Sequence, residues 1–329
     1  IGAISLGMLR ILSGFGLSPD AVCGHSYGEL PALHAAGRID ADALARLSGL
    51  RGRLMAAAAG EGTGAMAAVK APLETLQELL DTSGLDLVLA NRNSPEQGVV
   101  SGPAADVDRF ETLCGERGVK CVRLPVSAAF HSPLMRGVRD PFEAALADIP
   151  FTAAGIPVYA NATGGPYPDD AAAARQLLAD AIVRPVDFIG QIRTMYEAGV
   201  RTFVEVGPRT VLTGLISAIL ADTDAQAIAL DRSAGRRFGG ADLAGTLCRL
   251  AAMGHPVRLD RWESEPEAPP RQRMSIPLSG ANYRSERPQK PPKPAAEKPR
   301  KAEPDPIRMR PEPAPKSAET LSSAPQTNP

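Results

Sequence analysis

The chain has 329 residues, 44% of them hydrophobic, which is enough for one large domain or two smaller ones with a sizeable core. Its net charge of −1 gives no reason to expect nucleic acid or an anionic membrane as a partner, and no apolar run reaches the roughly 18 residues of a membrane span. The four cysteines contain no CxxC pair, which argues against a zinc site or a disulfide scaffold and predicts a reducing, cytoplasmic location.

The first predicted element is a helix from Gly2 to Gly14. Ile1 is not a methionine and lies inside this apolar segment, so we expect the chain to be a fragment whose natural N-terminus lies upstream. A turn at Leu17–Asp20 then leads into a short buried strand, Ala21–Cys23.

The stretch after this strand, Gly24-His25-Ser26-Tyr27-Gly28, contains the motif on which the functional interpretation depends. It has the form Gly-x-Ser-x-Gly of a nucleophile elbow, a sharp turn from a strand into a helix. Both glycines are expected to relieve crowding at the turn, so that the hydroxyl of Ser26 projects freely. A helix is predicted from Tyr27 to Ala36, and its N-terminal N–H groups would face charge that develops beside Ser26.

An arginine interrupts the apolar face of the next predicted helix, which begins after the cap Asp40 and runs to about Met55. Arg51 lies within the apolar stripe, whereas Arg46 and Arg53 point the opposite way. The stripe consists of Leu44, Leu47, Leu54 and Met55. A guanidinium there needs an anionic partner. That partner is either internal, such as Glu29, or the carboxylate of a substrate, and the spacing alone favours the internal salt bridge.

The segment 62–125 has a different predicted order of secondary structure: a strand, a helix, two strands, a helix and a strand. This order is that of a ferredoxin-like unit, and it predicts a small subdomain inserted into a larger one. The predicted elements are Ala65–Val69, Pro72–Asp81, Leu85–Ala90, Gln97–Ser101, Ala104–Gly115 and Lys120–Val126, with a turn at Asn91–Pro95.

His131 lies just before a helix that is predicted to begin around Ser132. Strands and helices alternate beyond it, which predicts a mostly parallel sheet covered by helices. The predicted elements are Pro157–Ala160, Ala171–Val183, Val186–Ala198, Thr202–Val206, Val211–Leu220, Ala225–Leu230 and Asp242–Met253. The expected fold class is therefore α/β, with a large subdomain made of residues 1–61 and 126–262.

Composition changes after Trp262, because 16 of the 31 prolines lie in residues 264–329 among lysine, arginine, glutamate and alanine. Such a segment cannot bury a core, so residues 263–329 are predicted to be a disordered, extended linker. One island, Ile276–Tyr283, has the composition of a segment that docks on the globular part.

Six ordered blocks together resemble the acyltransferase domain of a type I polyketide or polyunsaturated fatty acid synthase, a relative of malonyl-CoA:acyl carrier protein transacylases. The resemblance covers about residues 1–260 and implies an α/β-hydrolase-like core. The blocks are Gly24–Glu29, Leu50–Met55, Gly64–Val69, Asn91–Gly102, Ala129–Met135 and Val204–Pro208. The sequence Ser279–Arg284, followed by a tail rich in proline and lysine, resembles the end of such a domain.

The resemblance implies a role for each matched residue. Ser26 would attack the thioester of an acyl-CoA, and His131 would accept and return its proton. The backbone N–H of Tyr27 would hold the oxyanion, and the side chain of Tyr27 would lie at the substrate. Arg51 would pair with the carboxylate of malonyl or methylmalonyl groups, and the ring of Phe130 resembles the form selective for malonyl.

The same resemblance implies substrates and partners rather than a bound cofactor or metal. Malonyl-CoA would donate the acyl group, and the phosphopantetheine arm of an acyl carrier protein domain would receive it. Neighbouring synthase domains, a ketosynthase among them, would complete the parent protein. A second oxyanion donor, a glutamine, is expected upstream of Ile1, so the truncated chain is expected to lack it.

Two other functions share part of the pattern. A thioesterase or esterase of the α/β-hydrolase type would need an acid and a histidine after Ser26, and Asp231 with His255 have that order. A non-catalytic docking module within a synthase would retain the motifs as relics, which the intact Ser26, Arg51 and His131 argue against.

The remaining polar residues are given structural roles. His25 is expected to pack in the core, and His34 and His255 are expected to be structural or at the surface. Asn91 and Asn161 fit either pocket-shaping or turn-forming roles. Cys23 is expected to be a small buried apolar side chain.

Overall fold

The computed structural model describes residues 1–60, 62 and 64–262. The described residues belong to one compact unit. The predicted linker at 263–329, with its island Ile276–Tyr283, lies outside the described residues.

The N-terminal elements follow the predicted order closely. They are α1 (Gly2–Gly14), β1 (Val22–Cys23), the 3₁₀ helix η1 (Ser26–Gly28), α2 (Glu29–Ala35) and α3 (Ala41–Gly60). The carboxylate of Asp40 caps α3 by accepting the N–H of Ala43 at 2.7 Å, as predicted. The helix α3 continues past Met55, because the following four residues are alanines, the strongest helix formers.

A five-stranded sheet contains the predicted strands of the segment 62–125, in the order β5-β2-β4-β3-β7. Its elements are β2 (Gly64–Lys70), α4 (Leu73–Ser83), β3 (Val88–Ser94), β4 (Gln97–Pro103), α5 (Ala104–Glu116) and β5 (Lys120–Arg123). The predicted sequence of strands and helices is therefore present. The four strands within the segment pair in antiparallel fashion, and only the contact of β3 with β7 is parallel.

Two local predictions fail at the β3–β7 contact. Residues 91–94 were predicted to form a turn but continue β3, and residues Val186–Asp187 were predicted to begin a helix but form β7. Both segments gain a backbone ladder from each other, since Asn91 pairs with Val186 and Arg92 with Asp187. Such pairing between distant segments overrides local turn and helix preferences. The helix α8 (Phe188–Glu197) begins only after Asp187.

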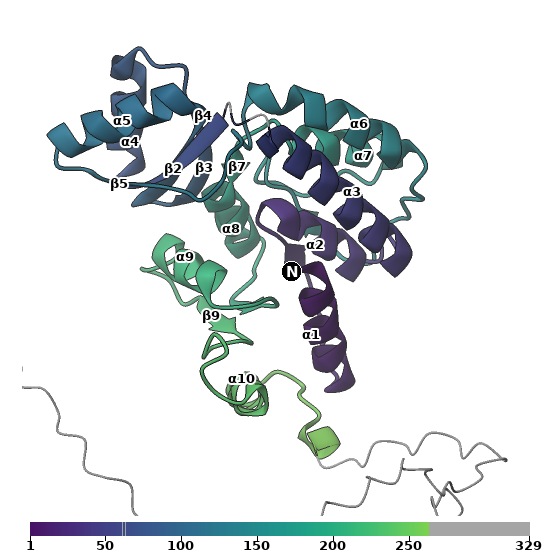
Figure 1. Cartoon of the computed structure of the whole chain (residues 1–329). Coiled ribbons are helices and arrows are strands. Elements are labelled where there is room, and N and C mark those ends of the chain that lie inside the picture. Colours follow the sequence, from purple (N-terminus) through teal and green to yellow (C-terminus); the bar gives the residue numbers. More distant parts are fainter. Residues whose placement is uncertain (61, 63, 263–329) are drawn as a thin grey trace, which may run out of the picture. The chain divides into compact units, whose positions relative to one another are not determined.

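The two faces of this sheet have different neighbours. Leucines of α4 and Phe110 of α5 join Ala67 and Val100 in one buried cluster, so both helices cover one face. Met66 and Val99 belong to a separate cluster on the other face, against which Phe130 packs. Figure 1 shows α4 and α5 beside the sheet and apart from α3, α6 and α7.

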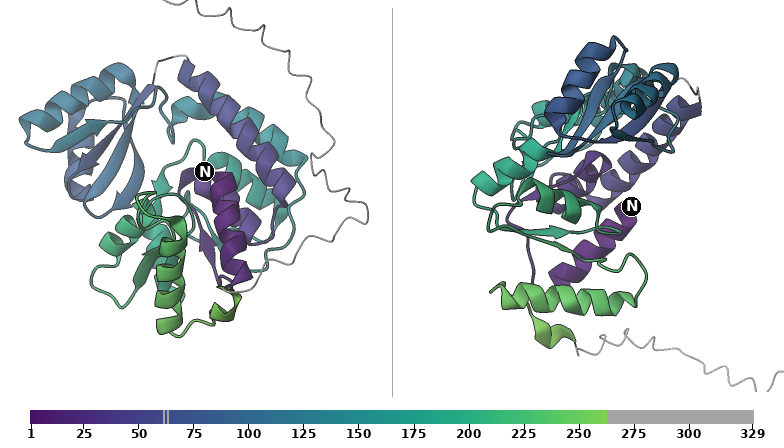
Figure 2. Two further views of the ribbon diagram at one scale, coloured as in Figure 1. Left: turned by 60° about the horizontal axis from the view of Figure 1, so that its bottom comes forward. Right: turned by 90° about the vertical axis from the view of Figure 1, so that its left-hand side faces the viewer.

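The second half of the unit alternates helices with short strands. Its elements are η2 (Pro133–Met135), α6 (Arg136–Ala147), β6 (Val158–Tyr159), α7 (Ala171–Asp180), β8 (Thr202–Glu205), α9 (Val211–Ile219), β9 (Gln226–Ala229), α10 (Gly239–Ala252) and η3 (Leu259–Trp262). Phe142 of α6, Leu47 of α3 and Leu178 of α7 are buried in one cluster. Figure 2 shows these helices packed side by side.

The predicted parallel sheet is only partly formed. The strands β1 and β6 pair in parallel, as do β8 and β9, but within the described residues each pair forms a sheet of its own. The ladders are two and four residue pairs long. Strands this short leave little backbone with which to bond a further neighbour, so the class is mixed α/β without one continuous parallel sheet.

Candidate active site

The elbow around Ser26 is held by a residue from the neighbouring strand. The strands β1 and β6 run parallel, so the segments after their carboxyl ends, with Ser26 and Asn161, lie side by side. Asn161 Oδ1 accepts the backbone N–H of Ser26 at 2.5 Å, and its Nδ2 donates to the carbonyl of Gly24 at 2.5 Å. Ser26 has φ 52°, a left-handed conformation that costs about 1 to 3 kcal/mol in a non-glycine residue. Asn161 therefore braces a strained turn.

Asn161 is the site residue whose role the sequence left open. Its backbone N–H donates to Glu29 Oε1 at 2.9 Å, and that same oxygen accepts the hydroxyl of Tyr167 at 2.9 Å. The sequence feature that could have indicated this role is the position of Asn161 directly after β6, the strand that pairs with β1. Asn91, the other asparagine left open, contributes its backbone to both edges of β3.

The two glycines of the elbow have unequal roles. A Cβ at Gly24 would overlap the backbone carbonyl of Gly28, so this position requires glycine. A Cβ at Gly28 would meet nothing within 4 Å, and its φ of −59° is ordinary. The predicted steric role is therefore wrong for Gly28.

This difference gives a matched pair of substitutions. We expect Gly24→Ala to lower the free energy of unfolding by about 1 to 3 kcal/mol, because the methyl group has to displace backbone atoms. Gly28→Ala should be neutral or stabilise by about 0.4 to 1 kcal/mol, because alanine has less freedom in the unfolded chain. Urea denaturation of both variants measures the difference, and equal effects would contradict the role given to Gly24.

His131 and Ser26 are joined by a hydrogen bond. Ser26 Oγ lies 2.8 Å from His131 Nε2, and His131 Nδ1 lies 2.9 Å from the carbonyl oxygen of Ala181. A carbonyl only accepts, so Nδ1 carries the proton, and in the neutral ring Nε2 accepts the hydroxyl hydrogen of Ser26. The ring is thus in the tautomer that a general base requires.

The charge state of His131 follows from its burial. The residue is 4% exposed. Burial, Arg51 and His25 together lower the pKa of His131 to about 3. The imidazole is therefore neutral, with one ring nitrogen unprotonated, throughout the physiological pH range.

Arg51 contacts the hydroxyl of Ser26 directly. Its Nη2 donates to Ser26 Oγ at 3.0 Å, and its guanidinium carbon lies 5.8 Å from the centre of the Tyr27 ring. The internal salt bridge to Glu29 that the spacing favoured is not formed, since none of the salt bridges between described residues includes Arg51. Burial lowers the pKa of Arg51, whereas the charge of Glu29 acts in the opposite direction. The guanidinium thus lies at the hydroxyl of Ser26.

Glu29 is buried behind the elbow rather than paired with Arg51. It is 2% exposed, and burial raises the pKa of its carboxyl to about 7. Hydrogen bonds from Asn161 and Tyr167 act against that rise. Glu29 therefore supports the bracing residue Asn161.

Tyr27 and Phe130 adjoin the residues of the site. Ser48 donates its hydroxyl hydrogen to the carbonyl of Leu44 at 2.6 Å, so the phenol of Tyr27 is the donor in its 2.7 Å bond to Ser48 Oγ. This bond directs Tyr27 along α3 toward Arg51. Phe130 is half-buried between the helical core and the sheet face that contains Met66. The substrate contacts of Tyr27 and Phe130 stay predictions.

The other histidines have structural partners. His25 Nε2 lies 2.7 Å from Asn93 Oδ1, and the His25 ring meets the Phe188 ring edge-on, which agrees with core packing. His34 Nδ1 lies 3.0 Å from the carbonyl of Ile39.

The acid and histidine that a hydrolase would need are not brought together. Asp231 accepts the backbone N–H groups of Arg209 and Gly235. His255 instead bonds the hydroxyl of Thr202 at 3.0 Å.

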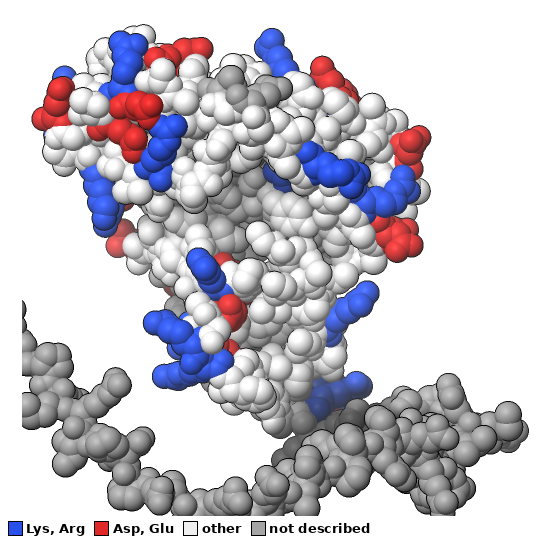
Figure 3. Space-filling view, in the orientation of Figure 1, with Lys and Arg blue, Asp and Glu red and all other residues white. Residues whose placement is uncertain are grey.

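Surface charge, possible metal ligands and possible membrane-spanning helices were also considered for the described residues. Figure 3 shows lysine, arginine, aspartate and glutamate at the flanks of the displayed face, whereas its middle is mostly uncharged. In the described ranges, no three His, Cys, Asp or Glu side chains are grouped as metal ligands would be. No described helix combines the length and apolar character needed to cross a membrane.

A strained serine bonded to a neutral buried histidine is the arrangement of a nucleophilic acyl-transfer centre. A sequence model of the acyl transferase domain family matches residues 1–237, and the chain belongs to this family.

Two curated relatives and one solved structure illustrate the similarity. The chain is 32% identical over 297 residues to a polyunsaturated fatty acid synthase protein of Thraustochytrium sp., and the match spans 88% of this chain but 10% of that protein. It is 38% identical over 226 residues to the polyketide biosynthesis malonyl CoA-acyl carrier protein transacylase BaeC of Bacillus velezensis, spanning 67% of this chain and 76% of the relative. The solved structure is a type II polyketide synthase acyl carrier protein in complex with its malonyl transacylase. There the TM-score is 0.68 and the identity 32%, with 75% of this chain and 79% of that chain covered.

Proposed function

We propose that the chain transfers a malonyl group from CoA to the phosphopantetheine thiol of an acyl carrier protein, within polyketide or fatty acid biosynthesis. One observation carries this proposal: Ser26 Oγ lies 2.8 Å from His131 Nε2 and 3.0 Å from Arg51 Nη2. A single methylene separates the thioester carbonyl of malonyl-CoA from its carboxylate. A nucleophile that acts on this substrate therefore needs its base and a carboxylate-binding group close together.

The first half of the reaction loads the serine. Ser26 Oγ attacks the thioester carbonyl while His131 Nε2 takes the hydroxyl proton. The carbon–sulfur bond then breaks, and His131 returns the proton to the departing CoA sulfur. The malonyl group remains as an ester on Ser26.

The second half unloads it onto the carrier protein. The phosphopantetheine thiol gives its proton to His131 Nε2, and the sulfur attacks the ester carbonyl. The carbon–oxygen bond to Ser26 breaks, and the proton passes from His131 to Ser26 Oγ. The free serine is restored, so the cycle is of the ping-pong type.

Binding of the substrate would use the groups around the serine. The fork of Arg51 would hold the malonyl carboxylate by two parallel hydrogen bonds. The backbone N–H of Tyr27, the residue after the nucleophile, would donate to the oxyanion. The side chains of Tyr27 and Phe130 would limit the room beside the α-carbon and so disfavour methylmalonyl.

We also infer the finer architecture and context. The strand order β5-β2-β4-β3 supports a ferredoxin-like subdomain at 62–125, inserted into an α/β-hydrolase-like part formed by residues 1–61 and 126–262. The similarity to one segment of a much longer synthase protein supports neighbouring synthase domains, including a ketosynthase. A cytoplasmic location fits the four free cysteines.

Intact-mass measurement tests the function directly. The 329-residue chain is incubated with malonyl-CoA, with Ser26→Ala as the control. We expect a malonyl adduct that the control lacks and that an acyl carrier protein bearing phosphopantetheine discharges. Release of free malonate without a carrier protein would favour a thioesterase, and absence of any adduct would favour a docking module.

A further inference from the structure

Backbone groups just after α7, those of Ala181 and Arg184, hold the His131 ring. Ala181 follows the last residue of α7, and its oxygen lies 2.9 Å from His131 Nδ1. Among the backbone hydrogen bonds of the described residues, none ends on this oxygen, as is usual for the last carbonyls of a helix. The position of the end of α7 therefore influences which ring nitrogen carries the proton.

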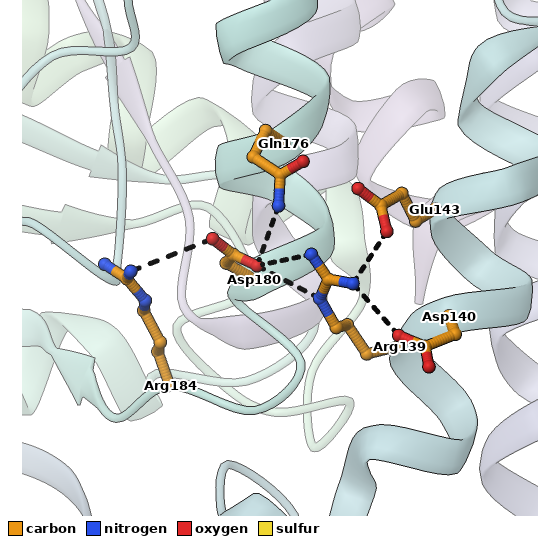
Figure 4. A network of polar contacts seen from close by, with 6 residues as sticks. All are labelled: Arg139, Asp140, Glu143, Gln176, Asp180 and Arg184. Carbon is orange, nitrogen blue, oxygen red and sulfur yellow. Dashed lines mark hydrogen bonds and ion pairs between the residues drawn. The ribbon is translucent and has the colours of Figure 1, made fainter.

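An ion pair fixes this end of α7 to α6. Arg139 of α6 directs Nε and Nη2 to Asp180 Oδ1, each at 3.1 Å, and Asp180 is the last residue of α7 (Figure 4). Gln176 Nε2 donates to the same oxygen at 3.2 Å, and Arg184 Nη2 lies 3.8 Å from Oδ2. The side chains of Arg139 and Asp180 are only 22% and 19% exposed, so water screens this pair less than an ordinary surface pair.

The two ends of this connection lead back to the histidine. Along the chain, His131 is followed by Ser132, by η2 and then by α6, which carries Arg139. Across space, Arg139 holds Asp180, whose neighbour Ala181 accepts the proton of His131 Nδ1. The contacts thus form a closed loop, because the helix that follows His131 along the chain also holds the hydrogen-bond acceptor of His131 in place.

Apolar packing alone does not explain the pair. Val138 and Phe142 of α6 and Leu178 of α7 belong to one buried cluster, which keeps the two helices together. Such contacts are not directional, so a small shift of α7 along its axis costs little free energy. Two hydrogen bonds to one oxygen, in contrast, fix the position of α7 relative to α6. Moreover, a carboxylate at a helix C-terminus opposes the helix dipole, so Asp180 needs cationic neighbours in order to remain there.

We propose that the Arg139–Asp180 ion pair is a positioning device for His131. It holds the Ala181 carbonyl at His131 Nδ1, which keeps the proton on that nitrogen and leaves Nε2 free to accept the proton of Ser26. Arg139 and Asp180 are positioning residues, because they act through the carbonyl and do not touch the reacting atoms. The effect on acyl transfer rests on the proposed function, whereas the effect on the tautomer does not.

The tautomer can be measured in the substrate-free protein. Histidine is labelled with ¹⁵N in the full chain, and the ring shifts of His131 are recorded for the wild type, Asp180→Asn and Arg139→Met. We expect only the Nδ1–H form in the wild type and a mixture with the Nε2–H form in both variants. The rate of Ser26 malonylation should fall by about 10-fold with little change in KM, because a misplaced base acts only in the chemical step. Arg139→Lys, which keeps the charge, should restore part of both properties.

Two neighbours of Arg139 provide matched controls. Asp140 and Glu143 also accept hydrogen bonds from Arg139 Nη1, but both lie on α6 and do not contact α7 in this network. Asp140→Asn and Glu143→Gln should therefore keep the wild-type tautomer and rate.

Three results decide the matter. A pure Nδ1–H form in Asp180→Asn would overturn the proposal, and so would control variants that behave like Asp180→Asn. Asp180→Asn, which preserves the size of the side chain, serves as the test if Arg139→Met does not fold. A wild-type protein that forms no malonyl adduct would contradict the proposed function alone, because the tautomer is measured without substrate.

Discussion

His131→Ala is expected to slow malonylation of Ser26 by about 10²- to 10⁴-fold, the usual contribution of a general base. The loss should appear mainly in kcat, because Ser26 and Arg51 remain to bind the substrate. Rapid-quench mass spectrometry of the acyl-enzyme measures this rate directly.

The pH dependence of the wild type tests the same assignment. The pKa of His131 is lowered to about 3, so its base form persists as the pH falls and is lost only near that value. The rate should consequently show no loss around pH 6.5, where an ordinary histidine becomes protonated. By the same linkage, the unfolded chain binds more protons below about pH 6.5, so the native state should lose stability between that pH and about 3.

His255→Ala is the matched control, because His255 bonds Thr202 and has no hydrogen bond to the elbow. It should keep the wild-type rate. A large loss in His255→Ala together with a small loss in His131→Ala would contradict the assignment and favour the hydrolase.

Arg51→Ala is expected to lower kcat/KM for malonyl-CoA by roughly 10²-fold, because a charge-assisted, two-point contact with the carboxylate is lost. Acetyl-CoA has no carboxylate, so its kcat/KM should change far less. The preference for malonyl over acetyl should therefore largely disappear. Competition between the two thioesters, with both Ser26 adducts counted by mass, measures the ratio.

Arg53→Ala serves as the control for Arg51. Arg53 lies two residues further along α3 and is exposed, so its loss removes the same charge without touching the site. It should leave the preference unchanged. Arg51→Lys should fall between the two, since lysine keeps the charge but not the planar fork. Unchanged malonyl preference in Arg51→Ala would refute the carboxylate-binding role.

Local patterns were sufficient for elements whose stability is local. The helix α1 and the alternation of strands and helices from Gly64 to Arg123 follow the periodicity of apolar residues. The cap at Asp40 follows from its carboxylate, which accepts a backbone N–H of the first turn. Predictions failed where a distant strand supplied the hydrogen bonds, as at Asn91 and Val186. A pairing between segments some 95 residues apart leaves no mark in either segment that periodicity detects.

The sequence by itself predicted which residues form the candidate site. The motif around Ser26 and the family blocks with His131 and Arg51 predicted three residues that the structure brings together at one hydroxyl. Residue type and spacing can predict this much, because a Gly-x-Ser-x-Gly turn between a buried strand and a helix is the pattern of a nucleophile elbow.

Only the tertiary structure decided what surrounds that serine. It turned Arg51 toward Ser26 Oγ rather than toward Glu29, and it assigned the bracing of the elbow to Asn161. It also supplied the Ala181 carbonyl that sets the tautomer of His131, and the ion pair that holds it. These contacts join residues 25 to 135 positions apart, and their partners are decided by which strand ends and helix ends meet. Which strand and helix ends lie next to one another is a property of the packed fold and not of any single segment of the chain.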